Sequence, residues 1–309
     1  MELQFATLDV FTDTPLKGNP LAVVTVPPSL SSTLSQAQKQ AIAKEFNLSE
    51  TVFIHDVEEV DSTARRIDIF TPALELPFAG HPTIGTAVHL QPLGVKSLVV
   101  KAGHIRIESL GSNSVRVEIP HNVRLHSKRL TRLSNHRQDA PAELANAEVG
   151  ALIFSIVKGM TFVLIELPSL ELLATAQVGV MGTIPVDLLD EGWRVKWVAR
   201  RYYFVRLGTE DSGGRLVHKI RTRMIRPDME DPATGSAACA LASYLSLHVL
   251  KEDDIHFEMI QGVEMGREST ILLDVHVKQD SDGTRKLESL HLGGTATPIM
   301  KGTIRIPST

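Results

Sequence analysis

Two segments share the pattern Pro-x-x-Gly-[Thr/Ser]-Ala, and each stands where strand-like sequence gives way to an apolar helix. The first runs from Pro82 to Ala87 and the second from Pro232 to Ala237. A few shared positions can arise by chance, but the matching contexts favour an internal duplication. We therefore expect two similar lobes, each offering the first turn of its helix to one shared cleft.

The chemistry of a helix start explains why these turns attract attention. Its first N–H groups have no partner inside the helix, and the positive end of the helix dipole adds to them. Small residues let an anion approach closely, which is typical of a carboxylate or phosphate site. The alternative is that Gly and Pro only make tight turns and both helices are core. The pairing of the turns, with His81 beside one and Asp231 beside the other, favours a clamp for a small anionic substrate.

Hydrophobic periodicity predicts a strand-rich chain with few helices. Helices are expected at 35–46, 83–90 and 237–247. Alternating or short apolar runs predict strands at 5–11, 21–26, 51–54, 65–70, 97–100, 105–108, 115–119, 152–157, 161–166, 194–199, 202–207, 219–225, 256–260, 271–277, 289–292 and 303–306.

The periodicity fades between residues 121 and 146. The His/Arg-rich segment 121–137 raises the question of a metal or anion site, but its spacing fits no ligand pattern and a solvated connector explains it. With 309 residues the chain is long for one core. We place the N-terminal lobe at 1–122 plus about 295–309, and the C-terminal lobe at 123–294.

Composition excludes several classes of function. The net charge is −4 and no basic stripe is present, which argues against a nucleic-acid partner. The single cysteine, Cys239, excludes a disulfide framework and a cysteine-based zinc site, and its apolar setting predicts a buried, inert thiol. No apolar run approaches about 18 residues, and no signal peptide follows Met1. We expect a cytoplasmic protein that binds a small molecule and no membrane.

Motifs for common cofactors are also missing. The sequence contains no Walker loop, His-Glu-x-x-His pair or Gly-x-Ser-x-Gly elbow. The stretch 208–214 contains several glycines but is expected to be a polar loop, without the strand–turn–helix context of a dinucleotide site. The simplest expectation is a reaction that uses neither metal nor cofactor.

Three titratable residues stand beside turns. Glu50 lies between a predicted helix and an apolar strand, where a partly desolvated carboxylate would suit proton transfer on carbon; the alternative is an exposed charge that ends the helix. Asp231 is either an N-terminal helix cap or a substrate contact. His81 is either a turn residue or a donor beside an anion site.

Several longer motifs follow one another along the chain. They are Phe11-Thr12 with Gly18-Asn19-Pro20-Leu21-Ala22-Val23-Val24, Asn47-Leu48-Ser49-Glu50-Thr51, Phe78-Ala79-Gly80-His81-Pro82-Thr83 with Gly85-Thr86-Ala87, Glu230-Asp231-Pro232-Ala233-Thr234-Gly235-Ser236-Ala237, Gln261-Gly262, Met265-Gly266-Arg267-x-Ser269 and Gly293-Gly294-x-Ala296. Together they resemble the phenazine-biosynthesis PhzF-like isomerase/epimerase family, and the resemblance covers nearly the whole chain.

This resemblance implies a diaminopimelate-epimerase-like fold of the α+β class. Two pseudo-symmetric β-rich lobes are each wrapped around a central helix, with the active site between them. The resemblance further implies a homodimer and catalysis without metal or cofactor. Where the related epimerases carry two proton-exchanging cysteines, this chain has Ala79 and Pro232 nearby, so two-cysteine racemisation is not expected.

The family's best-known reaction isomerises a dihydro-hydroxyanthranilate. By resemblance, Glu50 would remove a proton from an activated carbon of a small acid and return it to another carbon of the same conjugated system. Two alternatives stay open: an epimerase or racemase of an amino or hydroxy acid, and a catalytically silent ligand-binding protein. The other residues that match the family's site are His81 and Asp231, expected to share protons, and the substrate contacts Gly80, Gly235, Ser236, Ser49 and Asn19.

Overall fold

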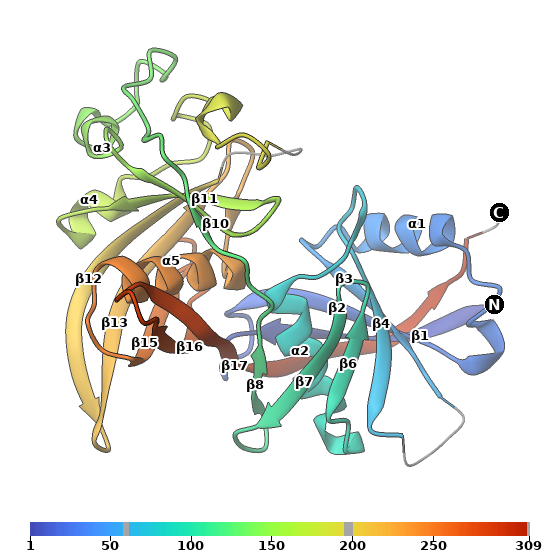
Figure 1. Cartoon of the computed structure of the whole chain (residues 1–309). Coiled ribbons are helices and arrows are strands. Elements are labelled where there is room, and N and C mark those ends of the chain that lie inside the picture. Colours follow the sequence, from blue (N-terminus) through green and yellow to red (C-terminus); the bar gives the residue numbers. More distant parts are fainter. Residues whose placement is uncertain (58–61, 195–199, 308–309) are drawn as a thin grey trace. The chain divides into compact units, whose positions relative to one another are not determined.

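The computed structural model describes residues 1–57, 62–194 and 200–307 (Figure 1). The chain divides into two units, Met1–Glu118 with Leu292–Thr309, and Ile119–His291. Strands dominate both units and few helices accompany them. The α+β class predicted from the sequence is confirmed.

In the first unit, parallel and antiparallel neighbours occur in a fixed order. β1–β2 is antiparallel, β2–β3 parallel, β3–β4 and β4–β5 antiparallel, β4–β6 parallel and β6–β7 antiparallel. β17 returns along β1 as a further antiparallel neighbour. The elements are β1 (Glu2–Val10), β2 (Asn19–Val26), η1 (Pro28–Leu30), α1 (Gln36–Phe46), β3 (Thr51–His55), β4 (Ala64–Phe70), β5 (Glu75–Leu76), α2 (Gly80–Leu90), η2 (Gln91–Leu93), β6 (Ser97–Val100), β7 (Gly103–Ser109), β8 (Ser114–Glu118) and β17 (Arg285–Arg305), which begins in the second unit.

The second unit repeats this order. β10–β11 is antiparallel, β11–β12 parallel, β12–β13 and β13–β14 antiparallel, β13–β15 parallel and β15–β16 antiparallel. The identical sequence of pairings supports the internal duplication. The elements are β9 (Arg124–Leu125), α3 (Ala142–Ala147), β10 (Leu152–Val157), β11 (Met160–Glu166), α4 (Leu170–Ala174), η3 (Val186–Leu188), β12 (Arg201–Ser212), β13 (Arg215–Ile225), β14 (Glu230–Asp231), α5 (Gly235–His248), β15 (Asp254–Gln261) and β16 (Ser269–Gln279).

The short strands β5 and β14 fix how the two copies correspond. Phe70 pairs with Glu75 in the first unit, and Ile225 pairs with Glu230 in the second. Both pairs close the same kind of tight connection ahead of the central helix. The equivalent segments of the duplication therefore begin at Glu75 and Glu230.

This correspondence changes the register that the sequence pattern suggested. α2 begins at Gly80 and α5 at Gly235, so these glycines are equivalent, and so are Pro77 and Pro232. The superposition of Pro82 on Pro232 was wrong, because Pro82 lies inside the first turn of α2 whereas Pro232 precedes α5. Short patterns of small residues recur, and the strand pairing alone decides which occurrence corresponds.

The strands of each unit surround one buried helix. Every residue of α2 except His89 is buried, and α2 packs on β1, β2, β3, β6 and β8. α5 packs in the same way on β10, β11, β15 and β16. A Cβ atom on Gly85 would lie 2.6 Å from Leu21 Cδ2 and Val10 Cγ2, so only glycine lets α2 approach β1 and β2 this closely. A helix that is apolar on all sides is expected to be enclosed in this way.

Some details of the secondary structure differ from the prediction. Residues 208–214 are largely the end of the β12–β13 hairpin, whose turn is Gly213-Gly214 with φ of 65° and 86°. The strands predicted at 289–292 and 303–306 fall in β17, apart from Ile306. At Gly294 this strand lies against Phe11, where a Cβ atom would be 2.4 Å from Phe11 Cδ1. The strand predicted at 194–199 falls mostly outside the described residues.

The stretch 121–146 is also more than a solvated connector. His126, Leu130 and Leu144 are buried, and the two leucines belong to a hydrophobic core with residues of β10, β11 and β12. The periodicity is weak because these apolar anchors are widely spaced among exposed polar residues. Packing against the sheet therefore orders a segment without an amphipathic pattern of its own.

A buried charged cluster ties α1 to β3 and β4. Lys39, 3% exposed, pairs with Asp68, and His55 Nε2 lies 2.7 Å from Asp68 Oδ2. His55 Nδ1 contacts Ser31 Oγ at 3.1 Å. Burial alone would raise the pKa of Asp68, but hydrogen bonds and charges from His55 and Lys39 outweigh burial and hold it well below its ordinary value.

We predict that this cluster makes the protein sensitive to acid. Because the folded chain lowers the pKa of Asp68, the stabilisation is complete above the unfolded value of about 3.9 and is lost as the pH falls below it. Asp68→Asn should lower the free energy of unfolding at neutral pH by about 3 kcal/mol, since Lys39 then lacks its counter-charge. It should also flatten the decline below about pH 4. Chemical denaturation across pH measures both effects.

The matched control is Asp139→Asn. Asp139 pairs with Arg137 at 3.0 Å, but both side chains are more than half exposed, so little stability should change. An acid-induced decline that is equally steep in Asp68→Asn and in the unmodified chain would contradict the prediction.

Candidate active site

The predicted acid/base Glu50 and the predicted donor His81 lie together in the first unit. His81 Nδ1 is 3.0 Å from Glu50 Oε2, and the two side chains are 4% and 19% exposed, respectively. Glu50 directly precedes β3, and His81 belongs to the first turn of α2. The strands thus bring together two residues that are distant in sequence as a largely buried carboxylate–imidazole pair.

The alternative view of Glu50 as a helix-ending charge is wrong. α1 ends at Phe46, and Asn47 caps it in the left-handed conformation with φ of 51° and its N–H bound to Ala43 O. Glu50 lies beyond this cap, at the entry to a buried strand. Its place in the fold is set by β3 and by its contact with His81.

The second ring nitrogen of His81 is unusual. His81 Nε2 is buried, and no hydrogen-bond partner for it exists in the described part of the chain. Buried polar atoms in native proteins are nearly always satisfied, so each exception needs an explanation. A ligand atom at Nε2 supplies one.

The first turn of α2 adds backbone donors beside this imidazole. α2 is preceded by Ala79, which cannot cap it with a side chain, so the helix starts without a side-chain cap. Gly80 opens the helix with no side chain to obstruct an approaching anion. The turn therefore offers positive potential next to His81, as predicted from the sequence.

Two expected contacts also meet in this unit. Ser49 Oγ donates to Asn19 Oδ1 at 3.4 Å. Asn19 is buried at the start of β2, which runs parallel to β3 beside Glu50. The predicted residues of the first unit thus form two adjoining polar pairs, because Ser49 and Glu50 are neighbours in the chain.

In the second unit the residue that directly precedes α5 is Thr234 rather than Asp231. The Thr234 hydroxyl donates to Asp231 Oδ2 at 2.7 Å, so Asp231 binds the side chain of the residue at the helix start. Thr234 precedes α5 as Ala79 precedes α2, so Thr234 is the counterpart of Ala79. Gly235 and Ser236 then open α5.

Sequence reasoning assigned no role to two residues that contact Asp231. One is Thr234, and the other is Gln261, whose Nε2 donates to the Asp231 carbonyl at 2.8 Å. The sequence feature that marks Gln261 is the Gln261-Gly262 pair among the family motifs. The pairing of β15 with β13 is what brings Gln261 to Asp231.

Packing and hydrogen bonds within the second unit hold Cys239, His126 and His136. Cys239 is 1% exposed within α5, and burial raises the pKa of its thiol strongly. His126 bonds Ser155 Oγ and the Asp190 N–H, and His136 accepts the Gly182 N–H. Across residues 1–57, 62–194 and 200–307, no group of three His, Cys, Asp or Glu side chains is arranged to hold a metal ion.

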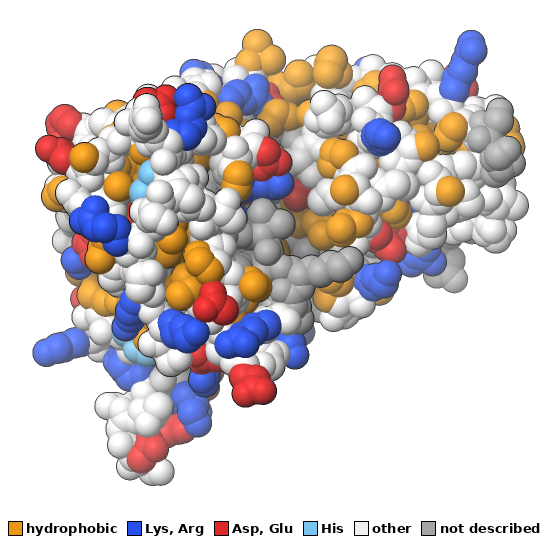
Figure 2. Space-filling model, turned by 90° about the horizontal axis from the view of Figure 1, so that it is seen from above, with side chains coloured by type: hydrophobic (Ala, Val, Ile, Leu, Met, Phe, Trp, Pro, Cys, Tyr) orange, Lys and Arg blue, Asp and Glu red, His pale blue; other side chains and the backbone are white. Residues whose placement is uncertain are grey.

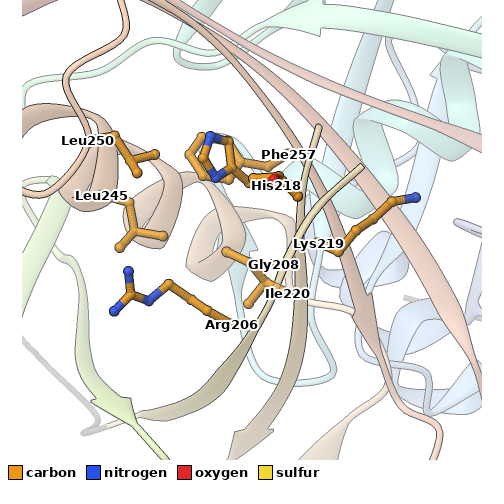
Figure 3. Close-up of a pocket in the computed structure, with 9 residues that line it drawn as sticks. Arg206, Gly208, His218, Lys219, Ile220, Leu245, Leu250 and Phe257 are labelled. Atoms are coloured by element: carbon orange, nitrogen blue, oxygen red, sulfur yellow. The ribbon is translucent and has the colours of Figure 1, made fainter. Parts of the chain in front are cut away.

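A pocket of about 240 Å³ lies beside the C-terminal end of α5 (Figure 3). Arg206, Leu245 and Leu250 line one side, and His218 and Phe257 pack together on another. It contains none of the predicted site residues. Its cations already have acidic partners, Arg206 with Glu166 and Lys219 with Glu210 and Glu258. We therefore assign it no part in the reaction.

Charged side chains of both signs are mixed on the surface. Acidic and basic side chains are interspersed over the face drawn in Figure 2, without one extended basic area. None of the described helices combines the length and apolar character needed to cross a membrane.

The similarity to known proteins extends over nearly the whole chain. A family model described as phenazine biosynthesis-like protein, PhzC-PhzF, matches residues 8–302. An uncharacterized isomerase from Mesorhizobium japonicum is 33% identical over 321 residues, covering 96% of this chain and 97% of that protein. A trans-2,3-dihydro-3-hydroxyanthranilate isomerase from Pseudomonas chlororaphis is 30% identical over 317 residues, covering 97% and 98%.

A solved structure shows the same fold. The crystal structure of a PhzF-family phenazine biosynthesis protein from Bacillus anthracis superposes with a TM-score of 0.71 at 20% identity, over 99% of this chain and 100% of that one. The predicted diaminopimelate-epimerase-like fold, with strands wrapped around a helix in each unit, is confirmed.

We predict that Cys239 is unreactive in the folded protein. A thiol reagent such as Ellman's should modify the native chain at least about a hundredfold more slowly than the unfolded chain, because α5 must first open. Absorbance kinetics with and without guanidinium measure the ratio. Fast modification of the native protein would refute the assignment of Cys239 to the core.

Proposed function

The chain belongs to the PhzC-PhzF family of phenazine biosynthesis-like proteins, and from that premise we propose that this isomerase moves a proton between two carbons of a small carboxylic acid. The observation that carries the proposal is the Glu50–His81 pair, with a buried imidazole nitrogen left for a ligand. A positioned carboxylate is a suitable base for an activated C–H bond, and once protonated it is a suitable acid.

His81 holds Glu50 through the same contact in both protonation states of the carboxyl group. While Glu50 is ionised, His81 donates from Nδ1 to it and Nε2 can accept a hydrogen bond from the substrate. When one oxygen of Glu50 has taken the carbon-bound proton, the other oxygen can still accept from Nδ1, so the imidazole keeps its proton there. The N–H groups at the start of α2 then stabilise the anion that forms on the substrate. Return of the proton from Glu50 to another carbon regenerates the starting state.

The substrate's carboxylate would lie at the first turn of α2. Gly80 permits close approach, and the uncapped N–H groups and helix dipole favour negative charge there. The Asn19–Ser49 pair would contact a polar substituent of the same molecule. In the second unit, the family motif assigns substrate contacts to Asp231, Gly235 and Ser236.

The first compound to test is trans-2,3-dihydro-3-hydroxyanthranilate, the substrate in the name of the Pseudomonas chlororaphis relative. It is a small cyclic acid whose ring allows a proton to move between carbons of a conjugated system. Product stereochemistry separates isomerisation from epimerisation of an amino or hydroxy acid. Binding without any proton exchange would instead identify a catalytically silent protein.

We predict that Glu50→Gln folds normally but loses activity. The amide still meets His81 but cannot take a proton from carbon, so incorporation of solvent deuterium into the substrate should fall by about a thousandfold. Mass spectrometry of the recovered substrate and product measures it. Glu45→Gln, an exposed change in α1, is the matched control and should exchange like the unmodified enzyme. Full exchange in Glu50→Gln would remove Glu50 from this role.

We predict a smaller effect for His81→Asn. The amide can still contact Glu50, but nothing replaces Nε2, so kcat/KM should fall about 10- to 100-fold. Combined with Glu50→Gln it should add little further loss, because the pair acts as a unit. His89→Asn on the same helix serves as the control. Additive losses in the double variant would show that the two residues act independently.

A further inference from the structure

Gln261 at the end of β15 is fully buried, and the proposed function gives it no role. Its Oε1 accepts from the Thr234 N–H at 3.3 Å and from the Tyr202 hydroxyl at 3.2 Å. Its Nε2 donates to the Asp231 carbonyl at 2.8 Å and to Thr234 Oγ1 at 3.1 Å. Both donors of the amide are therefore used, and its acceptor faces three donors, the third being the Thr222 hydroxyl at 3.5 Å.

The partners fix which way the amide faces. A backbone N–H can only donate and a backbone carbonyl can only accept. Thr234 N–H therefore requires the oxygen of Gln261 on its side, and Asp231 O requires the nitrogen on the other. Turning the amide over would break both bonds at once. Burial raises the pKa of Tyr202 strongly, so its hydroxyl keeps the proton that it donates.

Gln261 also orients the carboxylate of Asp231, through the Thr234 hydroxyl. Thr234 Oγ1 accepts from Gln261 Nε2, so the Thr234 hydroxyl hydrogen is directed toward Asp231 Oδ2, 2.7 Å away. The backbone of Asp231 is bound by the same Gln261 amide. The Gln261 side chain thus holds the main chain of Asp231 directly and its carboxylate through Thr234.

The glycine after Gln261 makes this close approach possible. Gly262 has φ of 78°, and a Cβ atom there would lie 2.6 Å from Pro232 O and 2.5 Å from Arg267 O. Any larger residue would push the end of β15 away from the turn before α5. Gly262 therefore allows the end of β15, with the Gln261 amide, to lie against the turn that contains Asp231 and Thr234.

We propose that Gln261 is a positioning residue for the reaction, holding the Asp231 carboxylate and the first turn of α5 in one geometry. The proposal rests on the proposed function, in which Asp231 contacts the substrate. Tyr202 and Thr234 act with Gln261 as parts of the same network.

Two variants of Gln261 test the proposal in the full-length protein. Gln261→Met keeps the volume but removes both donors and the acceptor, so kcat/KM should fall about 10- to 100-fold. Gln261→Glu keeps the acceptor but donates only when protonated, so its deficit should shrink as the pH is lowered. The loss of kcat/KM in Asp231→Asn is the upper limit for the Gln261 variants. All variants are assayed with trans-2,3-dihydro-3-hydroxyanthranilate.

The control for burial is Ser243→Ala. Ser243 is equally buried in α5, but its hydroxyl bonds Cys239 O within the helix and touches nothing at the turn. It should leave kcat/KM unchanged. If kcat/KM fell equally in Ser243→Ala and Gln261→Met, the Gln261 effect would be general destabilisation of the fold, and the proposal would be overturned.

Amide hydrogen exchange without substrate provides a separate measurement. The Thr234 N–H should exchange about tenfold faster in Gln261→Met, remain protected in Gln261→Glu and be unaffected in Ser243→Ala. Unchanged protection in Gln261→Met, or kcat/KM equal to that of the unmodified enzyme, overturns the inference alone. An unmodified enzyme that moves no proton overturns the proposed function, and amide exchange then still decides whether Gln261 holds the turn.

Discussion

A helix enclosed on all sides must bring the polar groups of its first turn into the interior of its unit, and this constraint organises both halves of the chain. α2 and α5 are each surrounded by strands of their own unit, so water cannot freely satisfy their first N–H groups. Each unit therefore places polar side chains at that turn. Those side chains are the predicted site residues and their immediate partners.

The two units differ in the chemistry of the polar groups at this turn. In the second unit Gln261 accepts the Thr234 N–H and saturates its own amide, which produces a rigid turn. In the first unit the turn carries His81, bound to Glu50 on one side and, among the described residues, unpartnered on the other. The two copies of one plan therefore differ in whether the polar side chain at this turn is saturated by the chain itself.

The buried histidines differ in how many of their ring nitrogens have partners. His55 uses both ring nitrogens, on Ser31 and Asp68, and His126 uses both, on Ser155 and the Asp190 N–H. These rings are fully engaged in holding the fold. His81 differs because its Nε2 lacks a partner in the described chain. Desolvation of a polar atom costs free energy, which a bound ligand recovers.

The sequence by itself determined the α+β class, most of the strands, the three helices α1, α2 and α5, and the motif residues Glu50, His81 and Asp231. These depend on local periodicity and on short motifs, which are written along the chain. Only the tertiary structure decided that Glu50 meets His81, that Gly80 corresponds to Gly235, and that Gln261 binds the turn at Asp231. Each of these depends on strand register, which brings together residues far apart in the chain. A local pattern shows which face of a strand is buried, but not which distant strand becomes its neighbour, because that choice depends on the packing of the whole sheet.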